Sequence, residues 1–386
     1  MAASRGLRVR DSIHGLIEYS ERERDLMDSP VLQRLRGIKQ LALTCLVYPG
    51  ATHTRFEHSL GVMYLAGRIA DRLNLTERQI RLVRAAALLH DIGHLPFSHA
   101  GEAAAAALTP GLRELGEEAH ERITWAFIEQ DEELRGILGR DCDGVLDILE
   151  KGKRRTKGWE PLLSHIVSGP LDADKLDYLL RDSLMAGVKY GVFDVERLVD
   201  SFVAYGQSSD RSLLVRREDS YCVEQMLLAR YYITEQVYRH RVRRITDAML
   251  RHAVIATRDI DNPAAKEVRK LFRVRPDSPR WRKQFLLSND CSVLTTLAET
   301  PAGTTCHKLA DRLLSRRLLK EILAHPIAGI GGTQWTDGLI RDPTNQDKTA
   351  KRLARALDMP SDEVILDLRT RDNPLYRDPD LPMEEE

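Results

Sequence analysis

The spacing of apolar residues constrains this fold more than any other feature of the sequence. Across residues 76–93, Ile80, Val83 and Ala87 recur at steps of three and four residues, which places them on one face of an α-helix. Thr76 stands at the position expected for the N-cap of that helix. Because such a helix has an apolar face to bury, we expect several helices to share one core.

The same helical period recurs along most of the chain, and strand-like alternation is rare. The helical stretches are residues 59–75, 121–130, 221–256 and 307–324, and the alternating stretches are residues 212–219 and 362–369. We therefore expect a mainly α fold with small β excursions. No period of roughly 20 to 50 residues repeats, which argues against a solenoid.

Changes in composition suggest how this fold is divided. We expect a helical core over residues 1–260, a C-terminal helical or α+β lobe packed on it over residues 261–375, and a disordered acidic tail over residues 376–386. The tail prediction rests on the proline and glutamate content of those last residues.

Composition excludes several classes of function. Lys plus Arg and Asp plus Glu both total 58, so no overall charge favours nucleic acid or an anionic membrane, and a site for polyanions has to be local. No apolar run approaches the roughly 18 residues of a membrane helix, and the N-terminal residues lack a hydrophobic signal core. The five cysteines are scattered without a CxxC pair, which is typical of a reducing compartment. We therefore expect a cytoplasmic protein without membrane contact.

Three separate helical stretches carry histidine or aspartate beside apolar positions, where a desolvated polar group needs a partner. His90 and Asp91 are adjacent, and the Ile-Gly that follows predicts that the helix ends there, which lets both side chains turn toward one point. His58 and Asp174 each lie near the start of another helix and can approach the same point. Two histidines and two aspartates without a thiolate suit a divalent Mg, Mn, Fe or Zn ion.

Each of these residues also has a purely structural interpretation. His58 or His90 alone is more often a hydrogen-bonded helix histidine, and Asp174 alone is more often an N-cap. Two further histidines, His94 and His99, follow within nine residues of His90. Because a structural role alone does not account for such a set, we favour a metal site.

The pattern of these four residues resembles the H…HD…D signature of the HD superfamily. Residues 13–67, HDIGHLPFSHAGE and LDADKLDYLLRD more closely resemble the deoxynucleoside triphosphate triphosphohydrolases, including the dGTPases and the catalytic domain of the sterile-alpha-motif and HD-domain proteins. The similarity covers residues 8–255. It implies an HD-domain helical bundle that uses a divalent metal ion to hydrolyse deoxynucleoside triphosphates to deoxynucleoside and tripolyphosphate.

Other branches of the superfamily fit the sequence less well. Guanosine-tetraphosphate hydrolases carry carboxylates soon after their HD pair, whereas His94, Phe97, Ser98 and His99 follow Asp91 here, and the GYP segment of cyclic-dinucleotide phosphodiesterases is absent. Two alternatives stay open. One is an HD phosphohydrolase that acts on nucleoside monophosphates or diphosphates, modified nucleotides or nucleic-acid ends. The other is a nucleotide-sensing or nucleic-acid-binding module without turnover.

Hydrolysis at the α-phosphate needs an acid that protonates the departing deoxyribose oxygen, and imidazole suits proton transfer near neutral pH. His99 and Glu102 are about one helical turn apart, so the carboxylate can orient the imidazole. The resemblance implies that His94, His99 and His120 are the catalytic histidines, with Glu102 in place of an aspartate that the family uses. A solvated loop position is the structural alternative for His120.

The resemblance also implies contacts with the substrate. A triphosphate carries about four negative charges, so its site needs cationic side chains. Tyr178 and Asp182 share a helix face with Asp174, which places a ring and a carboxylate within reach of a sugar. The resemblance implies that Arg55 and Lys175 contact the phosphates and that Arg230 and Tyr238 lie near the substrate. It also implies that Tyr178 and Asp182 contact the deoxyribose, and that Gln40 and Leu41 approach the base and the sugar.

An activating nucleotide is a further expectation. Asp28, Gln33 and Arg36 resemble positions that read a guanine nucleotide in some relatives, although Arg10 replaces an asparagine of that pattern. We also expect a homo-oligomer, either a dimer or a tetramer.

Two basic stretches, residues 151–157 and 239–244, raise the question of nucleic-acid binding. The first lacks the interleaved aromatic residues on which bases stack. We interpret it as solvated surface or a subunit contact, so a nucleotide rather than a nucleic acid is the favoured partner.

Overall fold

The structure of this chain is a computed structural model that describes residues 7–109, 112, 119–152, 161–207, 210–322, 343–360 and 363–367. Helices dominate the described residues, and the strands among them form two small two-stranded sheets. The prediction of a mainly α fold with small β excursions is confirmed. Most of the basic stretch at residues 151–157 and the whole predicted tail at residues 376–386 lie outside the described residues.

Four helices form the layer that carries the candidate site. They are α3 (Arg55–Arg72), α4 (Glu77–Leu89), α9 (Pro161–Ser168) and α10 (Ala173–Ala186), and α3 packs against the other three. Their facing sides are lined with buried aliphatic residues that belong to one hydrophobic core. α4 begins with a capping box in which Thr76 is the N-cap, which confirms that prediction.

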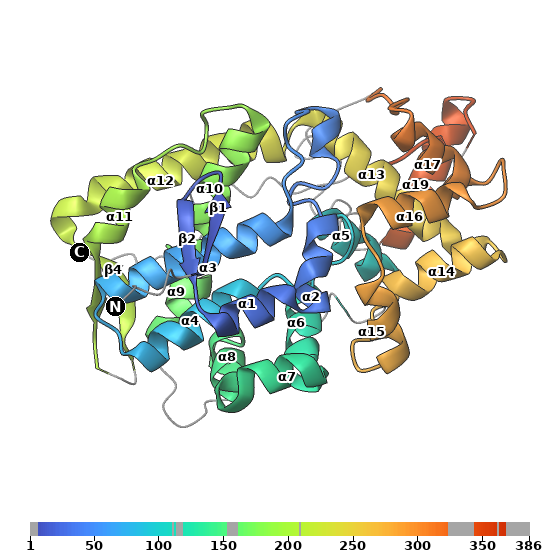
Figure 1. Ribbon diagram of the computed structural model, residues 1–386. Helices are drawn as coiled ribbons and strands as arrows, with labels where there is room; N and C mark the ends of the chain where they lie inside the picture. Colours follow the sequence, from blue (N-terminus) through green and yellow to red (C-terminus); the bar gives the residue numbers. More distant parts are fainter. Residues whose placement is uncertain are drawn as a thin grey trace.

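The other helices lie around this layer (Figure 1). Up to residue 260 they are α1 (Glu21–Asp28), α2 (Pro30–Gln33), α5 (Ser98–Leu108), α6 (Ala119–Gln130), α7 (Glu132–Leu138), α8 (Cys142–Leu149), α11 (Val195–Ser201), α12 (Ser220–Ile233) and α13 (Arg241–Ala256). After residue 260 they are α14 (Pro263–Phe272), α15 (Pro279–Leu286), α16 (Asp290–Ala298), α17 (Thr305–Leu314) and α19 (Pro343–Ala356).

The helices after residue 260 gather at one end of the molecule, on the right of Figure 1. α13 links them to the rest, because it packs against both α5 and α17. α14 also packs against α5, the helix that begins just before His99. The candidate site is therefore in contact with the C-terminal helices, while the proposed boundary at residue 260 stays a prediction.

Two antiparallel hairpins account for the strands. β1 (Leu7–Asp11) pairs with β2 (Gly15–Tyr19), and β3 (Phe202–Tyr205) pairs with β4 (Ser212–Val215). β4 occupies the first half of the alternating stretch at residues 212–219, so a strand there is confirmed.

The alternating stretch at residues 362–369 does not form a strand over its described residues 363–367. Asp367 instead pairs with Arg244 of α13 at 2.9 Å. Alternation gives a segment two faces, but a strand also needs a backbone partner, and these residues lie against a helix.

The helical stretch at residues 221–256 is divided in two. A π-helical turn at Thr234–Tyr238 ends α12, and α13 starts after His240. The ring of His240 accepts the backbone N–H of Val242 at 3.2 Å and so caps α13. The hydrophobic period runs through this stretch, whereas the helix is interrupted by the π-helical turn and the cap at His240.

The helical stretch at residues 307–324 ends early, at Leu314. Arg316 has a left-handed φ of 54°, and the backbone N–H of Arg317 donates to the carbonyl of Arg312 at 2.8 Å. This closing pattern terminates many helices.

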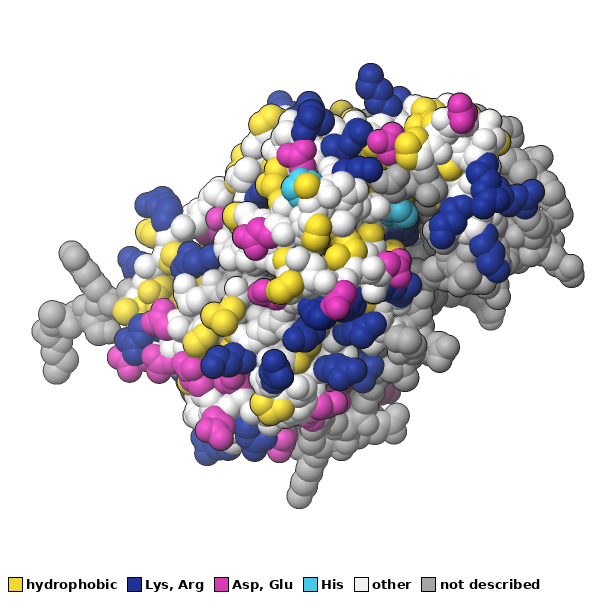
Figure 2. Space-filling model, turned by 90° about the vertical axis from the view of Figure 1, so that its right-hand side faces the viewer, with side chains coloured by type: hydrophobic (Ala, Val, Ile, Leu, Met, Phe, Trp, Pro, Cys, Tyr) yellow, Lys and Arg dark blue, Asp and Glu magenta, His cyan; other side chains and the backbone are white. Residues whose placement is uncertain are grey.

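No helix among the described residues is long and apolar enough to cross a membrane. Figure 2 shows Lys and Arg side chains in several separate groups on one face, with acidic and hydrophobic side chains between them. That mixture fits the equal totals of basic and acidic residues in the chain.

Glu23 ties α1 to α4. Its carboxylate accepts two hydrogen bonds from Arg84, at 2.6 and 3.0 Å, and one from the backbone N–H of Ser20 at 2.8 Å. Burial raises the pKa of Glu23, but Arg84 and Ser20 lower it more, so the net shift is downward. The stability from this carboxylate is therefore present above the ordinary pKa of glutamate and is lost as pH falls through the lowered value.

We expect Glu23→Gln to lower the free energy of unfolding by about 1–3 kcal/mol at pH 7, because the ion pair with Arg84 is lost while Arg84 stays partly buried. The deficit should shrink below about pH 4, where the wild-type carboxylate also takes up a proton. Urea unfolding of both proteins at neutral and acidic pH measures this. The exposed Glu132→Gln is the control, and a deficit independent of pH would contradict the assignment.

Candidate functional site

The His-Asp pair forms where α4 ends. α4 stops at Leu89, His90 occupies the C-cap position, and the next three residues form a turn. Gly93 is required in that turn, because a Cβ there would lie 2.0 Å from the backbone oxygen of His120. The turn therefore packs against the start of α6 and brings His120 close to the pair.

His58 and Asp174 reach this turn from α3 and α10. Nε2 of His58 lies 2.9 Å from Oδ1 of Asp174 and 3.7 Å from Oδ2 of Asp91. Nε2 of His90 lies 3.2 Å from Oδ1 of Asp91 and 3.8 Å from Oδ1 of Asp174. The structure thus brings together the four residues predicted as metal ligands, and we name them the metal-type group.

The open nitrogens of the two histidines fit a divalent ion. Nε2 of His58 and Nε2 of His90 are buried without a hydrogen-bond partner. Nδ1 of His90 faces the backbone oxygen of Ala87 at 2.7 Å, and Nδ1 of His58 faces a carboxylate of Asp177 at 2.8 Å, so both protons belong on Nδ1. Each Nε2 then directs a lone pair into the group. This His/Asp cluster is consistent with divalent metal binding.

Asp177, which the sequence did not single out, orients His58. Besides the hydrogen bond with His58, its buried carboxylate accepts two hydrogen bonds from Arg181, at 2.8 and 2.9 Å. It also makes a hydrogen bond with the ring of His14 at 2.7 Å. Gly61 makes room for it, because a Cβ there would lie 1.8 Å from Oδ1 of Asp177. The signal was the last aspartate of DADKLD, which lies about one helical turn beyond the predicted ligand.

The carboxylates around His58 favour its protonated form. Burial lowers the pKa of His58, but the carboxylates of Asp174 and Asp177 raise it more, to about 10. Burial raises the pKa of Asp174, whereas His58 and His90 lower it to about 2. An ion and a proton compete for the same lone pair of His58, so metal binding releases a proton.

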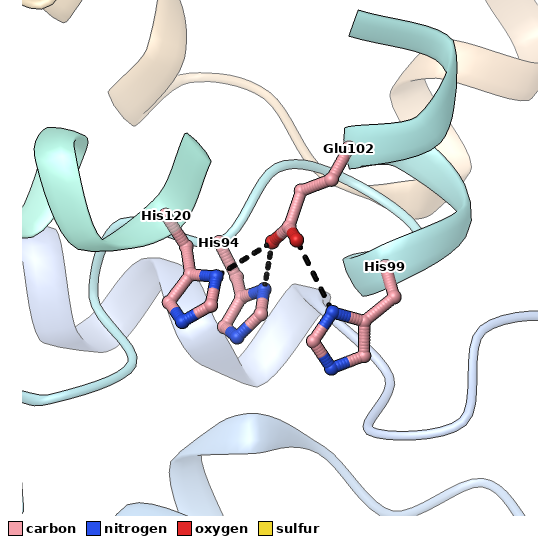
Figure 3. A group of neighbouring side chains, drawn as sticks. All are labelled: His94, His99, Glu102 and His120. Carbon is pink, nitrogen blue, oxygen red and sulfur yellow. Dashed lines mark hydrogen bonds and ion pairs between the residues drawn. The ribbon is translucent and has the colours of Figure 1, made fainter. Parts of the chain in front are cut away.

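Three histidines meet at the carboxylate of Glu102, and we name His94, His99, Glu102 and His120 the shared-carboxylate group (Figure 3). Oε1 of Glu102 lies 2.6 Å from Nδ1 of His94 and 3.1 Å from Nδ1 of His120. Oε2 lies 3.1 Å from Nδ1 of His99. The structure therefore brings together all four residues that were predicted to be catalytic.

Two of the imidazole rings in the shared-carboxylate group are stacked. The donor atoms of the four residues lie within 4.8 Å of one another, as metal ligands can. The rings of His94 and His120, however, stack with centroids 4.0 Å apart and planes 14° from parallel. Both rings bring Nδ1 to the same oxygen of Glu102, so the contacts in this group centre on one carboxylate.

Charge in this group also suits proton transfer. Burial raises the pKa of Glu102, but His120 and His94 lower it more, so the pKa lies well below its usual range. Burial, together with Arg55, lowers the pKa of His94 to about 4 and keeps that ring neutral at neutral pH. An ionised carboxylate among three imidazoles can hold a proton on one of them. His94 also joins the two groups, since its Nε2 lies 3.2 Å from Oδ1 of Asp91.

Asp182 and Tyr178 lie further along α10. Oδ1 of the buried Asp182 contacts Nε2 of His53 at 2.6 Å, and Oδ2 accepts the hydroxyl of Tyr238 at 2.5 Å. The rings of Tyr178 and Tyr238 meet edge to face with centroids 6.3 Å apart. The structure thus brings together three predicted substrate residues. His53 was missed, and its signal was a lone histidine in PGATHT just before α3.

Arg55, a predicted phosphate contact, is engaged within the protein. It is 3% exposed, and it donates to Oδ2 of Asp91 at 2.5 Å and to the hydroxyl of Ser98 at 2.7 Å. The guanidinium therefore neutralises a residue of the metal-type group.

Lys175, the other predicted phosphate contact, also has partners. Its Nζ donates to Oδ2 of Asp172 and to the carbonyl of Gly169, both at 2.7 Å. Asp172 is also the N-cap of α10, since its Oδ1 accepts the backbone N–H of Lys175. The capping alternative for Asp174 therefore falls away.

The remaining predicted substrate residues lie in different parts of the fold. Gln40 and Leu41 precede α3, where Leu41 is buried and Oε1 of Gln40 is buried without a hydrogen-bond partner. Arg230 lies partly buried on α12.

The three residues predicted for an activating nucleotide lie around α2. Asp28 and Arg36 are exposed, and the side-chain oxygen Oε1 of Gln33 accepts a hydrogen bond from Nε of Arg36 at 2.9 Å. The guanidinium of Arg36 also covers the ring of Phe56 at 3.6 Å.

Comparison with known families identifies two regions. A family model described as HD domain matches residues 55–181, and one described as HD associated region matches residues 193–377. The metal-type group and the shared-carboxylate group both lie within the first match. The chain therefore contains an HD domain followed by an HD-associated region.

Several curated proteins are similar to this chain. An uncharacterised protein of Methanocaldococcus jannaschii is 38% identical over 64% of this chain and 49% of its own length. A deoxynucleoside triphosphate triphosphohydrolase SAMHD1 homolog of Dictyostelium discoideum is 33% identical over 64% of this chain and 48% of its own length. The Bos taurus deoxynucleoside triphosphate triphosphohydrolase SAMHD1 is 30% identical over 65% and 47%. The chain spans about half the length of these relatives.

A solved structure is similar over most of the chain. The crystal structure of a phosphohydrolase from Bacteroides thetaiotaomicron matches with a TM-score of 0.72 and 26% identity. The match covers 93% of this chain and 85% of that one, so it includes the C-terminal helices.

We expect Asp177→Asn to weaken Mn²⁺ binding by about 10- to 100-fold, because the amide loses the charge that orients His58 and faces Arg181 with a donor group. Titration calorimetry with Mn²⁺ measures the affinity, and circular dichroism checks the fold. Asp200→Asn, an exposed residue at the end of α11, is the matched control. Full Mn²⁺ affinity in a folded Asp177→Asn variant would contradict the metal-site interpretation.

Proposed function

We propose that this protein is a metal-dependent HD-family phosphohydrolase that converts deoxynucleoside triphosphates to deoxynucleoside and tripolyphosphate. The observation that carries the proposal is the position of His94, whose two ring nitrogens face Asp91 of the metal-type group and Glu102 of the shared-carboxylate group. Metal-type ligands and imidazoles that can give a proton thus adjoin one another, as hydrolysis at phosphorus requires.

The residues that would hold the ion are His58, His90, Asp91 and Asp174. When bound, a divalent ion supplies Lewis-acid polarisation of a phosphoryl oxygen and orients water for attack. Mixed imidazole and carboxylate ligands suit Mn, Fe, Mg or Zn, and they do not choose among these metals.

Protonation of the departing deoxyribose oxygen is the task we assign to the shared-carboxylate group. The side chain of His99 is 60% exposed, so it can reach a substrate, while Glu102 is largely buried and ionised behind it. The contact with the carboxylate fixes the orientation of the ring that donates the proton. His120 shares the same oxygen as His94 and provides a second route for the proton.

Binding of a triphosphate at this site requires an exchange of partners. Arg55 pairs with Asp91 and Lys175 pairs with Asp172, so both cations are held by aspartates before substrate arrives. The phosphates of a nucleotide would take over part of these interactions. Because each cation is already fixed in direction, binding costs less side-chain entropy.

The sugar would lie against Tyr178, Tyr238 and Asp182. Burial raises the pKa of Tyr178 to about 12, so its hydroxyl stays protonated at neutral pH. A 3′-hydroxyl that donates to Asp182 would replace the hydroxyl of Tyr238 on Oδ2. A tyrosine packed against C2′ would exclude a ribonucleotide by sterics, because the added 2′-hydroxyl has no room.

The relatives support this substrate class and leave its details open. Two of the proteins described above carry the name deoxynucleoside triphosphate triphosphohydrolase at 30 to 33% identity, and the similar solved structure is called a phosphohydrolase. The homo-oligomer and the activating nucleotide at Asp28, Gln33 and Arg36 are proposals of the same kind. Gel filtration with and without GTP or dGTP tests both, and an unchanged assembly and rate would count against activation.

Product analysis tests the reaction. The protein is incubated with each dNTP and each NTP plus Mn²⁺ or Mg²⁺, and the products are separated by chromatography. We expect deoxynucleoside and tripolyphosphate from at least one dNTP, and no product from a folded Asp174→Ala variant. Orthophosphate or pyrophosphate alone would favour another HD phosphohydrolase. Absence of turnover with every nucleotide would favour a sensing module.

We expect Glu102→Gln to lower kcat by about 10²- to 10⁴-fold with little change in KM, because the amide has only one oxygen left to hold the Nδ1 atoms of the three histidines. Steady-state kinetics on the best dNTP measures both quantities. Glu132→Gln, on the surface of α7, should retain wild-type values, and an unchanged kcat in Glu102→Gln would exclude Glu102 from the reaction.

A further inference from the structure

Asp290 is a buried carboxylate that belongs to neither group of the candidate site. It is the first residue of α16, is 6% exposed and lies in the HD-associated region. Its Oδ1 accepts the backbone N–H of Phe97 at 2.7 Å, and its Oδ2 accepts that of Lys39 at 3.0 Å. Asn289, and not Asp290, is the N-cap of α16. Both oxygens of Asp290 accept hydrogen bonds from residues outside α16.

The segment that Asp290 contacts makes a sharp corner. Phe97 and Ser98 have consecutive left-handed φ angles of 65° and 52°, and both residues are buried. This backbone costs a non-glycine residue about 1 kcal/mol or more, so it persists where the surroundings hold it. The hydrogen bond from Phe97 to Asp290 is one such support.

A chain of contacts runs from this corner to the metal-type group. The hydroxyl of Ser98 donates to the carbonyl of Lys39 at 2.9 Å and accepts Nε of Arg55 at 2.7 Å. The same guanidinium donates to Oδ2 of Asp91 at 2.5 Å. Asp290 therefore binds both backbone positions, Phe97 and Lys39, that set the place of the Ser98 hydroxyl.

The other end of the same segment is also held from the C-terminal helices. The buried guanidinium of Arg34 donates to the carbonyl of His94 at 2.8 Å and to the carbonyl of Phe285 in α15 at 2.8 Å. It lies 3.7 Å above the ring of Phe285. Residues 94–98 are thus fastened at both ends to α15 and α16.

We propose that Asp290 is a positioning residue of the candidate site, which fixes the Phe97–Ser98 corner and, through Ser98 and Arg55, the direction of Asp91. The inference rests on the proposed function, because it assigns the consequence to metal binding and turnover. The HD-associated region then contributes directly to the geometry of the HD domain.

A purely structural role makes a different prediction. If Asp290 only fastens α16 to the core, its loss lowers stability and leaves the folded site unchanged. If it positions Asp91, its loss also weakens metal binding in protein that remains folded. Metal affinity and kcat, measured well below the unfolding temperature, separate the two cases.

The test is Asp290→Asn, which keeps the shape but turns an amide donor toward one backbone N–H. We expect Mn²⁺ affinity and kcat each to fall by about 10-fold or more, as for residues that orient metal ligands. Asp131→Asn is the matched control, because Asp131 also accepts a backbone N–H, that of Leu134 at 3.0 Å, but lies at the start of α7. It should keep wild-type Mn²⁺ affinity and most of its stability, because asparagine caps a helix about as well as aspartate.

Ser98→Ala interrupts the same chain without touching Asp290. We expect it to weaken Mn²⁺ binding similarly, and the double variant to be no weaker than the stronger single one, since both changes break one path. If Asp290→Asn does not fold, Ser98→Ala alone decides. Equal Mn²⁺ affinity in wild type and Ser98→Ala, or in wild type and folded Asp290→Asn, would overturn the proposal.

Hydrogen exchange separates failure of this inference from failure of the proposed function. In Asp290→Asn the amides of His94, Leu95, Phe97 and Ser98 should exchange faster than in wild type, whether or not an ion is bound. If the wild type binds no Mn²⁺, the metal-dependent function fails, and unchanged exchange in these residues would overturn the positioning role as well. Faster exchange together with weaker Mn²⁺ binding supports both.

Discussion

The buried carboxylate of Asp177 is the constraint on which the centre of this molecule depends. A charge without solvent costs several kcal/mol unless it is paired, and Asp177 meets that cost with Arg181, His14 and the Nδ1 of His58. Arg181 continues to Asp11 on β1 at 2.9 Å. One negative charge therefore links the N-terminal hairpin, α3 and α10. The same contacts direct the other nitrogen of His58 toward the metal-type group.

The two groups of the site differ in what their histidines face. In the metal-type group, Nε2 of His58 and of His90 is buried without a hydrogen bond, which suits an ion. In the shared-carboxylate group, three Nδ1 atoms converge on Glu102, which suits a proton. His94 touches both and stays neutral, so it separates two charged regions without adding charge of its own.

Sequence reasoning found the features that local pattern determines. The end of α4 at the His-Asp pair, the cap at Thr76 and the His99–Glu102 spacing each follow from a few neighbouring residues. It missed His53 and Asp177, whose partners lie far away in the chain. It also did not locate the break within residues 221–256, where a π-helical turn ends α12 and the ring of His240 caps α13.

Gly61 carries no functional group, yet its missing methyl is the space that the Asp177 carboxylate occupies. An alanine there would have to displace either a helix or a buried ion pair, and both lead to His58. We therefore expect a position without a functional group to be intolerant of substitution in this protein. A residue without a functional group thus helps to set the site, because the space beside it is filled by the carboxylate that orients His58.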